Sequence, residues 1–473
     1  MNALKSSSHP LGWMKSLLWL AFAVGCFHLA YVSTRFSAAG LMTLGYALAL
    51  VRLADQPTVR RAFYFGLAAG YLCYAPQLAF FWLIFGPAAI ALWTVIAIWI
   101  GLFTAMVCGC IQRWGKTKAT GLIPVIWTGL EYFRSELYYL KFSWLNIGYA
   151  FSDFKFSLFN VWGMYGVGFL IFAIVAVFAH RHLLKRALIG RLVVLLILFF
   201  CLTFALQHLA AARYKTPESP LSIVGVQMEF PPPNILPKAL DQALAKNPEA
   251  QIFVLSEYAL DGPVPDSLKD WCREHDRFLV VGGKDPVGTN NYYNTAYAVG
   301  TNGEIVFHQA KCVPIQFFKD GLPAPSQAVW NSPWGKIGIC ICYDLSYTRV
   351  TDRLVKEGAQ LLIVPTMDLE DWGRYEHALH ARVAPVRAAE YDIPVFRLAS
   401  SGISQAITGE GRVIAHTSFA TRMEVLAAQL KLPAYGSLPL DRLLAPVCTG
   451  ITGIVLATLL VLAWNNRRLR RKT

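Results

Sequence analysis

The sequence contains 473 residues, of which 55% are hydrophobic, and its mean hydropathy is +0.42. This composition is too apolar for an ordinary soluble chain and indicates several membrane segments. The formal net charge of +14 arises from Lys and Arg clustered in short loops between apolar segments, and no nucleic-acid-binding motif accompanies it. A nucleic-acid partner is therefore not expected, whereas a membrane is.

Seven apolar segments precede residue 212, and an eighth lies near the C-terminus. Each is long enough to be a membrane helix, although Glu131 and Arg134 interrupt the fifth. The first is not followed by a clear cleavage site, so we expect a retained helix. The predicted helices are Trp13–Ser33, Ala38–Ala54, Phe63–Trp82, Pro87–Ile111, Ile123–Leu137, Leu158–His180, Leu192–Ala211 and Leu443–Trp464.

These segments divide the chain into three parts. We expect a membrane bundle of seven helices at residues 1–212, a polar insert at 217–440, and a C-terminal transmembrane helix with a basic tail at 441–473. Most Lys and Arg residues lie near the termini and in alternate loops, which places both termini in the cytoplasm. By this parity the insert lies outside the cytoplasm.

Strands alternate with helices in the insert, which predicts an α/β domain, and a hairpin around Asn302-Gly303 makes its sheets mixed. The predicted strands are 221–226, 252–255, 278–282, 293–299, 304–309, 336–341, 361–365, 395–398, 403–407 and 413–416. The predicted helices are 235–246, 266–275, 345–356 and 373–391, the last kinked at Pro385.

Cys342 lies where the buried strand Lys336–Ile341 ends in Cys342-Tyr343-Asp344 and a helix is expected to follow. A rigid strand end would hold the sulfur, and the N-terminus of the helix would favour a thiolate nucleophile. A free cysteine is more often a small buried hydrophobe, and we interpret Cys340 in this way. The ten cysteines show no zinc spacing and no disulfide framework, so neither a metal nor a cofactor is expected.

Two charged residues also follow predicted strands. Glu257 ends Val254–Glu257, and Lys311 follows the strand that reaches Gln309. Either residue alone would suggest an ion pair. Together with Cys342 and in this order, they resemble the catalytic triad of the nitrilase superfamily. In that chemistry the glutamate takes the thiol proton, the thiolate attacks a carbonyl, and the lysine stabilises the oxyanion.

The whole chain resembles the apolipoprotein N-acyltransferase family. Besides the triad, the resemblance rests on Glu131–Ser135, Phe142–Tyr149 and Glu376–Arg382. It implies an α-helical membrane bundle of about eight helices with an extracytoplasmic nitrilase-like αββα domain. It also implies transfer of an acyl chain from a phospholipid donor, through a cysteine thioester, to the N-terminal amine of a diacylglyceryl-cysteine apolipoprotein acceptor. The expected location is the bacterial inner membrane, with the catalytic domain on the periplasmic side.

The resemblance also suggests roles for residues around the triad. Trp372, Asp368, Tyr343 and Asn294 are expected to bind substrate, with Trp372 as a lid that contacts lipid or as a plain hydrophobic plug. We interpret Arg387 and Glu390 as a structural pair, buried on one helix face. In the membrane part, Glu131 and Arg134 are interpreted as functional because they form a charged pair in an apolar setting; an interfacial anchor is the alternative.

The chain departs from the family after Lys311, because the family's supporting glutamate is missing. Gln316 or Asp320 could replace it. Two other functions therefore stay open: a membrane-anchored amidase that hydrolyses a small amide, and a catalytically inactive lipid-binding homologue. A lipid-facing cleft would argue against the amidase, and a closed polar pocket would argue for it.

Overall fold

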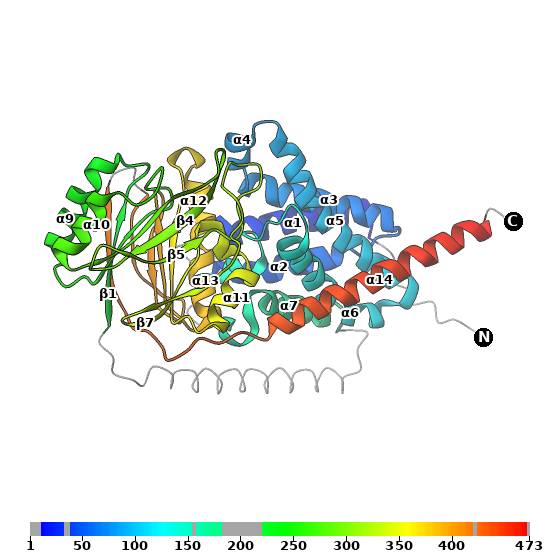
Figure 1. The fold of residues 1–473 in the computed structure, drawn as a ribbon. Coiled ribbons are helices and arrows are strands. Elements are labelled where there is room, and N and C mark those ends of the chain that lie inside the picture. The colour runs from blue at the N-terminus through cyan, green and yellow to red at the C-terminus, as the bar shows by residue number, and fades with distance from the viewer. Residues whose placement is uncertain (1–10, 33–37, 154–157, 182–219, 420–422, 471–473) are drawn as a thin grey trace.

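The computed structural model describes residues 11–32, 38–153, 158–181, 220–419 and 423–470. A helical bundle lies beside an α/β domain, and the long helix α14 (Asp441–Arg470) runs along the bundle, away from the sheets (Figure 1). Within the described residues, four helices are long and apolar enough to cross a membrane: α14, α1 (Trp13–Val32), α5 (Ala88–Trp114) and α7 (Phe159–Ala179).

The described bundle confirms the predicted helices and refines their bounds. The third predicted segment is divided into α3 (Val59–Gln77) and the short α4 (Phe80–Phe85), which ends at Gly86 with φ +56. The fifth becomes α6 (Lys116–Tyr132), followed by a π-helical turn. The predicted helix Leu192–Ala211 lies outside the described residues. The remaining bundle elements are α2 (Met42–Leu53), η1 (Ala39–Leu41), η2 (Phe133–Leu137) and η3 (Ile147–Phe151).

Two six-stranded mixed sheets form the α/β domain, in the orders β12-β1-β2-β3-β4-β5 and β11-β10-β9-β8-β7-β6. In each sheet three neighbouring strands are parallel and the others pair antiparallel. The strands are β1 (Leu221–Gln227), β2 (Ile252–Leu255), β3 (Phe278–Val287), β4 (Asn291–Val299), β5 (Ile305–Ala310), β6 (Val329–Ser332), β7 (Gly335–Ile339), β8 (Leu361–Thr366), β9 (Val395–Ala399), β10 (Gln405–Ile407), β11 (Val413–His416) and β12 (Glu424–Leu430).

The layers follow from strands that are apolar on both faces. In β2, Ile252 and Val254 face the second sheet, whereas Phe253 and Leu255 pack beneath α9 (Leu236–Lys246) and α10 (Asp266–His275). The second sheet is covered by three helices whose buried side chains share one core with the membrane bundle. These helices are α11 (Thr348–Lys356), α12 (Arg374–Ala381) and α13 (Val383–Tyr391).

Three local predictions were wrong. Strands β6 and β12 were not predicted; β12 reads Glu-Val-Leu-Ala-Ala-Gln-Leu, a composition that does not favour a strand, and pairing with β1 overrides it. The long helix breaks at Arg382 rather than at Pro385. Pro385 lies in the first turn of α13, where its missing N–H group costs nothing. The helix after Cys342 begins as a 3-10 turn, η7 (Cys342–Ser346), and α11 starts only at Thr348.

Candidate active site

The ends of three strands bring Glu257, Lys311 and Cys342 together. Lys311 Nζ lies 2.8 Å from Glu257 Oε1, and all three side chains are buried. Met367, which follows β8, connects Glu257 to Cys342. Its N–H donates to Glu257 Oε2 at 2.7 Å, and its carbonyl lies 3.8 Å from Cys342 Sγ. The predicted triad therefore forms one compact group.

Asp320 supplies the second carboxylate of this group. Its Oδ2 lies 2.7 Å from Lys311 Nζ and accepts the Ile315 N–H at 2.7 Å. Its Oδ1 accepts the Tyr258 hydroxyl at 2.8 Å and Asn294 Nδ2 at 2.9 Å. Of the two predicted replacements for the missing glutamate, Asp320 is thus the one that contacts Lys311.

Gln316, the other predicted replacement, points elsewhere. Its Nε2 donates to the backbone carbonyl of Tyr139, in the loop that follows α6 and η2. Gln316 therefore connects the lysine loop to the membrane bundle and does not contact Lys311.

The charges of the group follow from its burial. Burial alone would lower the pKa of Lys311, but the carboxylates of Glu257 and Asp320 hold it well above its usual value, so the ammonium is retained. Burial raises the pKa of Glu257, and Lys311 opposes this shift. The group therefore pairs one cation with two carboxylates in a site that excludes water.

The expected thiolate at Cys342 is not supported. Burial raises the pKa of this thiol well above its usual value, with the charge of Glu257 adding to the effect. Helix α11 begins six residues later, so its N-terminus does not meet the sulfur. Cys342 itself has φ +50, a left-handed conformation that is rare for a side chain other than Gly and typical of strained functional positions. The resting thiol needs a base.

Asp344 joins two segments: the turn Cys342–Ser346, here called the cysteine turn, and residues 311–321, here called the lysine loop. Its carboxylate accepts the backbone N–H groups of Cys312 at 3.0 Å, Val313 at 2.7 Å and Ile341 at 3.2 Å. Burial raises its pKa to about 6, although these bonds favour the charged form. This carboxylate fixes the spacing between Lys311 and Cys342.

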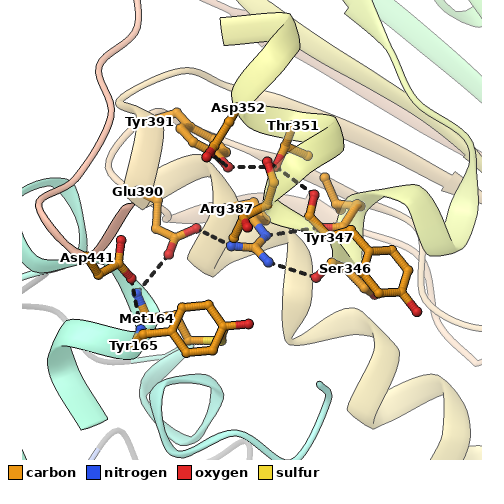
Figure 2. A network of polar contacts seen from close by, with 12 residues as sticks. Met164, Tyr165, Ser346, Tyr347, Thr351, Asp352, Arg387, Glu390, Tyr391 and Asp441 are labelled. Atoms are coloured by element: carbon orange, nitrogen blue, oxygen red, sulfur yellow. Dashed lines mark hydrogen bonds and ion pairs between the residues drawn. The ribbon is translucent and has the colours of Figure 1, made fainter. Parts of the chain in front are cut away.

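Arg387 and Glu390 hold the other side of the cysteine turn, as Figure 2 shows. Arg387 donates to the carbonyls of Leu345 at 3.0 Å and Ser346 at 2.8 Å, and it pairs with Glu390 at 2.5 Å. Both side chains are buried, so the predicted structural pair is confirmed. Glu390 in turn accepts the Met164 N–H at 2.7 Å, which ties the turn to α7.

A kink in α7 makes this junction possible. Gly163 has φ +67, and a Cβ placed there would lie 2.1 Å from the carboxylate of Asp441. The amides that follow are freed from the helix: Met164 donates to Glu390, and Tyr165 donates to Asp441 Oδ2 at 2.9 Å (Figure 2). Two carboxylates, one from α13 and one from the start of α14, thus cap the second half of α7.

A cavity of about 110 Å³ opens from Cys342 toward the membrane helices. Its wall is largely aromatic and aliphatic. The bundle contributes Phe80, Phe81, Ile84 and Phe85 of α4, Leu92, Val95 and Ile96 of α5, and Leu140, Lys141, Phe142 and Trp144. The catalytic side contributes Ile315, Gln316, Phe317, Phe318, Cys342, Tyr343, Trp372, Glu376 and His380.

The four predicted substrate-binding residues lie in two different places. Tyr343 and Trp372 line the cavity; the Tyr343 hydroxyl donates to Lys141 O at 2.9 Å, and the Trp372 ring lies 5.9 Å from that of Phe318. Asn294 and Asp368 do not line it.

Asn294 lies behind the triad, where Nδ2 donates to Glu257 Oε1 at 2.6 Å as well as to Asp320. Asp368 is buried between Arg397, at 2.6 Å, and His380, at 2.7 Å. Both side chains hold other residues in place, and neither is open to a substrate.

Sequence reasoning did not single out Glu376 and His380, although both line the cavity. They lie four residues apart on α12 and therefore share one face of the helix. The indole of Trp144 stacks on the His380 ring with centroids 4.5 Å apart. The i, i+4 spacing was the signal available in the sequence.

Glu131 and Arg134 contact a loop and do not line the cavity. Glu131 Oε1 accepts the Ile147 N–H at 3.0 Å, and Arg134 donates to Tyr74 at 3.4 Å and to Asn146. These bonds hold the segment after Trp144 against the bundle, which gives the pair a bracing role; the functional interpretation stays a prediction.

Comparisons with known proteins match the helical bundle and the α/β domain to two different families. The apolipoprotein N-acyltransferase N-terminal domain matches residues 16–177, and the carbon-nitrogen hydrolase family matches residues 219–439. An apolipoprotein N-acyltransferase of Geobacter metallireducens is 23% identical over 413 residues, which cover 75% of this chain and 78% of the relative. A deaminated glutathione amidase of Bos taurus is 28% identical over 206 residues, which cover 39% of this chain and 62% of the relative.

Among solved structures, a carbon-nitrogen hydrolase from Helicobacter pylori aligns with TM-score 0.40 and 16% identity, over 45% of this chain and 89% of that chain. The amidase relative matches less than half of this chain, whereas the Geobacter relative extends over three quarters of it. The N-terminal domain match accounts for the membrane helices that the α/β domain alone would leave unexplained. The chain therefore belongs to the apolipoprotein N-acyltransferase family of the nitrilase superfamily.

Proposed function

We propose that this protein transfers a fatty acyl chain from a membrane phospholipid, through a thioester at Cys342, to the N-terminal amine of a diacylglyceryl-cysteine apolipoprotein. The observation that carries the proposal is the cavity at Cys342, which is walled by apolar side chains of α4 and α5. An acyl chain fits such a wall because each buried CH₂ group contributes about 0.8 kcal/mol. A diacyl donor does not leave the bilayer readily, so the thiol is placed beside helices that can lie in it.

The first half-reaction begins with the protonated thiol of Cys342. Glu257 takes its proton, and the sulfur attacks the ester carbonyl of the phospholipid. Lys311, held by Glu257 and Asp320, stabilises the oxyanion. The C–O bond then breaks, the lysophospholipid oxygen takes the proton from Glu257, and a thioester remains.

The second half-reaction regenerates the thiol. The acceptor amine attacks the thioester carbonyl, the C–S bond breaks, and Glu257 passes a proton from the amine to the departing sulfur. Tyr343 and Trp372 line the route to the thioester, and we propose that they contact the acyl chains.

For localisation we propose the bacterial inner membrane with both termini in the cytoplasm and residues 217–440 on the periplasmic side. Residues 1–212 and 441–473 would form the membrane part. The support is the concentration of Lys and Arg at the termini and in alternate loops.

An amidase acting on a small amide is the second candidate, favoured by the sequence similarity to deaminated glutathione amidase. The same triad would serve, with water replacing the amine. The aromatic and aliphatic wall argues against it, because a small polar substrate gains little from such a surface.

The test is intact-mass spectrometry of the purified protein in phospholipid micelles, comparing wild type with Cys342→Ala. Wild type should gain a fatty-acyl mass that hydroxylamine removes, and Cys342→Ala should not. Cys312→Ala, which removes a partly exposed thiol in the lysine loop, is the matched control and should keep the adduct. A folded wild-type protein without an adduct would refute the phospholipid donor and favour the amidase.

A further inference from the structure

Glu376 and His380 stand out in the cavity because their polar atoms are buried and unused. Each side chain is 1% exposed. Among the described residues, neither oxygen of Glu376 and not Nε2 of His380 has a hydrogen-bond partner. Two histidine nitrogens lie near Glu376: His377 Nε2 at 3.5 Å, which is bonded to the Leu369 carbonyl, and His380 Nδ1 at 3.8 Å. An unpaired buried polar group costs about 1–3 kcal/mol, so these atoms call for an explanation.

The orientation of His380 is fixed from three sides. Nδ1 lies 2.7 Å from Asp368 Oδ1, Arg397 holds Asp368 Oδ2 at 2.6 Å, and Trp144 covers the ring face. A carboxylate partner places the proton on Nδ1 and leaves a lone pair on Nε2. Burial lowers the pKa of His380 to about 4 although Asp368 opposes the shift, so the ring is neutral at pH 7.

The free atoms of this pair are therefore hydrogen-bond acceptors. Glu376 and His380 line the same cavity as Cys342, and the two oxygens of Glu376 and Nε2 of His380 have no hydrogen-bond partner among the described residues. Their natural ligand is a group that carries several N–H donors and can be positively charged. A primary amine meets both requirements, since its ammonium form has three donors and its free base has two.

We propose that Glu376 and His380 form the subsite that binds the acceptor's α-amine and removes its extra proton before attack on the thioester. This inference rests on the function proposed above and adds the place where the amine is received. His380 Nε2 accepts one N–H and orients the nitrogen, while Glu376 accepts the proton. The free amine then forms the C–N bond as the C–S bond breaks, and its remaining surplus proton returns to sulfur through Glu257.

The need for such a group follows from the chemistry of the acceptor. An α-amine has a pKa of about 7.7–8.0, so most of it is protonated at neutral pH and is no nucleophile. Inside an apolar cavity a neutral acid beside a neutral amine is favoured over two poorly solvated charges.

A metal ion is the other ligand to consider, because ligand atoms of Asp368, Glu376 and His380 lie within 4.8 Å of one another. Asp368 is already engaged, because it bonds to His380 Nδ1 and pairs with Arg397. The amine is therefore favoured, and a metal becomes an outcome of the test.

The experiment follows the two half-reactions separately. Wild type, Glu376→Gln and His380→Gln are charged with phospholipid, and the decay of the Cys342 thioester is timed after mixing with a diacylglyceryl-cysteinyl peptide that has a free amine. Hydroxylamine, a neutral nucleophile at pH 7, is used in parallel. Glu357→Gln, a change at the surface of the domain just after α11, is the matched control.

We expect Glu376→Gln to form the thioester normally and to discharge it onto the peptide at least tenfold more slowly at pH 7. The defect should shrink above pH 8, where solvent removes the ammonium proton, and discharge by hydroxylamine should match wild type. His380→Gln should slow the peptide reaction at every pH, because it removes orientation rather than proton transfer.

Four results would overturn the inference. Glu376→Gln could discharge onto the peptide at the wild-type rate. The Glu376→Gln change could slow discharge by the peptide and by hydroxylamine equally. Alternatively, neither Glu376→Gln nor His380→Gln could form a thioester while Glu357→Gln does. Inhibition of the wild-type peptide reaction by EDTA would assign the cluster to a metal. A wild-type protein that never forms the thioester would instead refute the proposed function, and this inference with it.

Discussion

Replacing Asp320 by Asn tests whether this carboxylate, rather than Gln316, supports the lysine of the triad. Each oxygen of Asp320 accepts two donors: Lys311 Nζ and the Ile315 N–H on one side, the Tyr258 hydroxyl and Asn294 Nδ2 on the other. An amide has one oxygen, so whichever way the substituted side chain turns, its NH₂ group faces two donors.

The cost can be worked out from these contacts. Each buried donor left unpaired costs about 1–3 kcal/mol, or about 4 kcal/mol for two. The Lys311 ammonium would keep only Glu257 as a counter-ion and could shift from the oxyanion. A misplacement near 1 Å costs roughly 10²-fold in rate. We therefore expect Asp320→Asn to form the Cys342 thioester about 100-fold more slowly.

The assay is the rate of acyl-adduct formation by intact mass, with Gln316→Ala as the matched control. Among the described residues, the Gln316 side chain hydrogen-bonds only to the Tyr139 carbonyl, so its variant should keep the wild-type rate within a few fold. A wild-type rate in Asp320→Asn combined with a loss in Gln316→Ala would refute the assignment. A loss in both would show that the loop as a whole, and not the carboxylate, is what matters.

Three further predictions follow from the site and its supports. The acylation rate should rise with pH through a midpoint above the ordinary glutamate pKa of about 4.3, because burial raises the pKa of Glu257 and only its carboxylate form takes the thiol proton. A pH–rate profile checks this, and a midpoint at or below about 4.3 contradicts it. Glu390→Gln should lower stability by about 3–5 kcal/mol, since two buried guanidinium groups lose a shared partner; thermal unfolding in detergent measures it, and a melting temperature equal to that of Glu357→Gln would count against the pairing. Val95→Trp should fill the cavity and slow acylation by long-chain phospholipids more than by a short-chain ester, and an equal effect on both donors would show that the cavity does not hold the acyl chain.

The triad could be predicted because each member is marked by its own local pattern. A short strand precedes each of Glu257, Lys311 and Cys342 in the sequence. Their meeting in space is long-range, because β2 and β5 are separated by β3 and β4 in one sheet and β7 lies in the other. Nothing long-range had to be guessed to name these residues. The burial of the cluster could not be read in the same way, which is why a lowered thiol pKa was expected where burial raises it.

The choice between Gln316 and Asp320 depended on a loop whose path the sequence does not define. The chain reverses at Phe317, which has φ +69, and this turn sends Asp320 toward Tyr258, 62 residues away. The surroundings of Asp368 and Asn294 were likewise not defined by the sequence. The family resemblance suggested substrate contacts for both residues, but partners from distant strands and helices hydrogen-bond to their side chains.

The cavity belongs to neither half of the molecule alone, and this is why sequence patterns could not predict its wall. Phe85 of α4 packs against Phe317 and Phe318 of the lysine loop, with ring centroids 6.1 and 5.8 Å apart. At the other end of the junction, Glu390 and Asp441 cap the kinked helix α7 and so hold the cysteine turn against the bundle. A nitrilase-like triad is thereby fixed beside apolar helices at two separated points. Because both points resist rotation, the thiol keeps a constant position relative to α4 and α5, and the same chemistry that could act on a soluble amide is directed to an acyl chain from the bilayer.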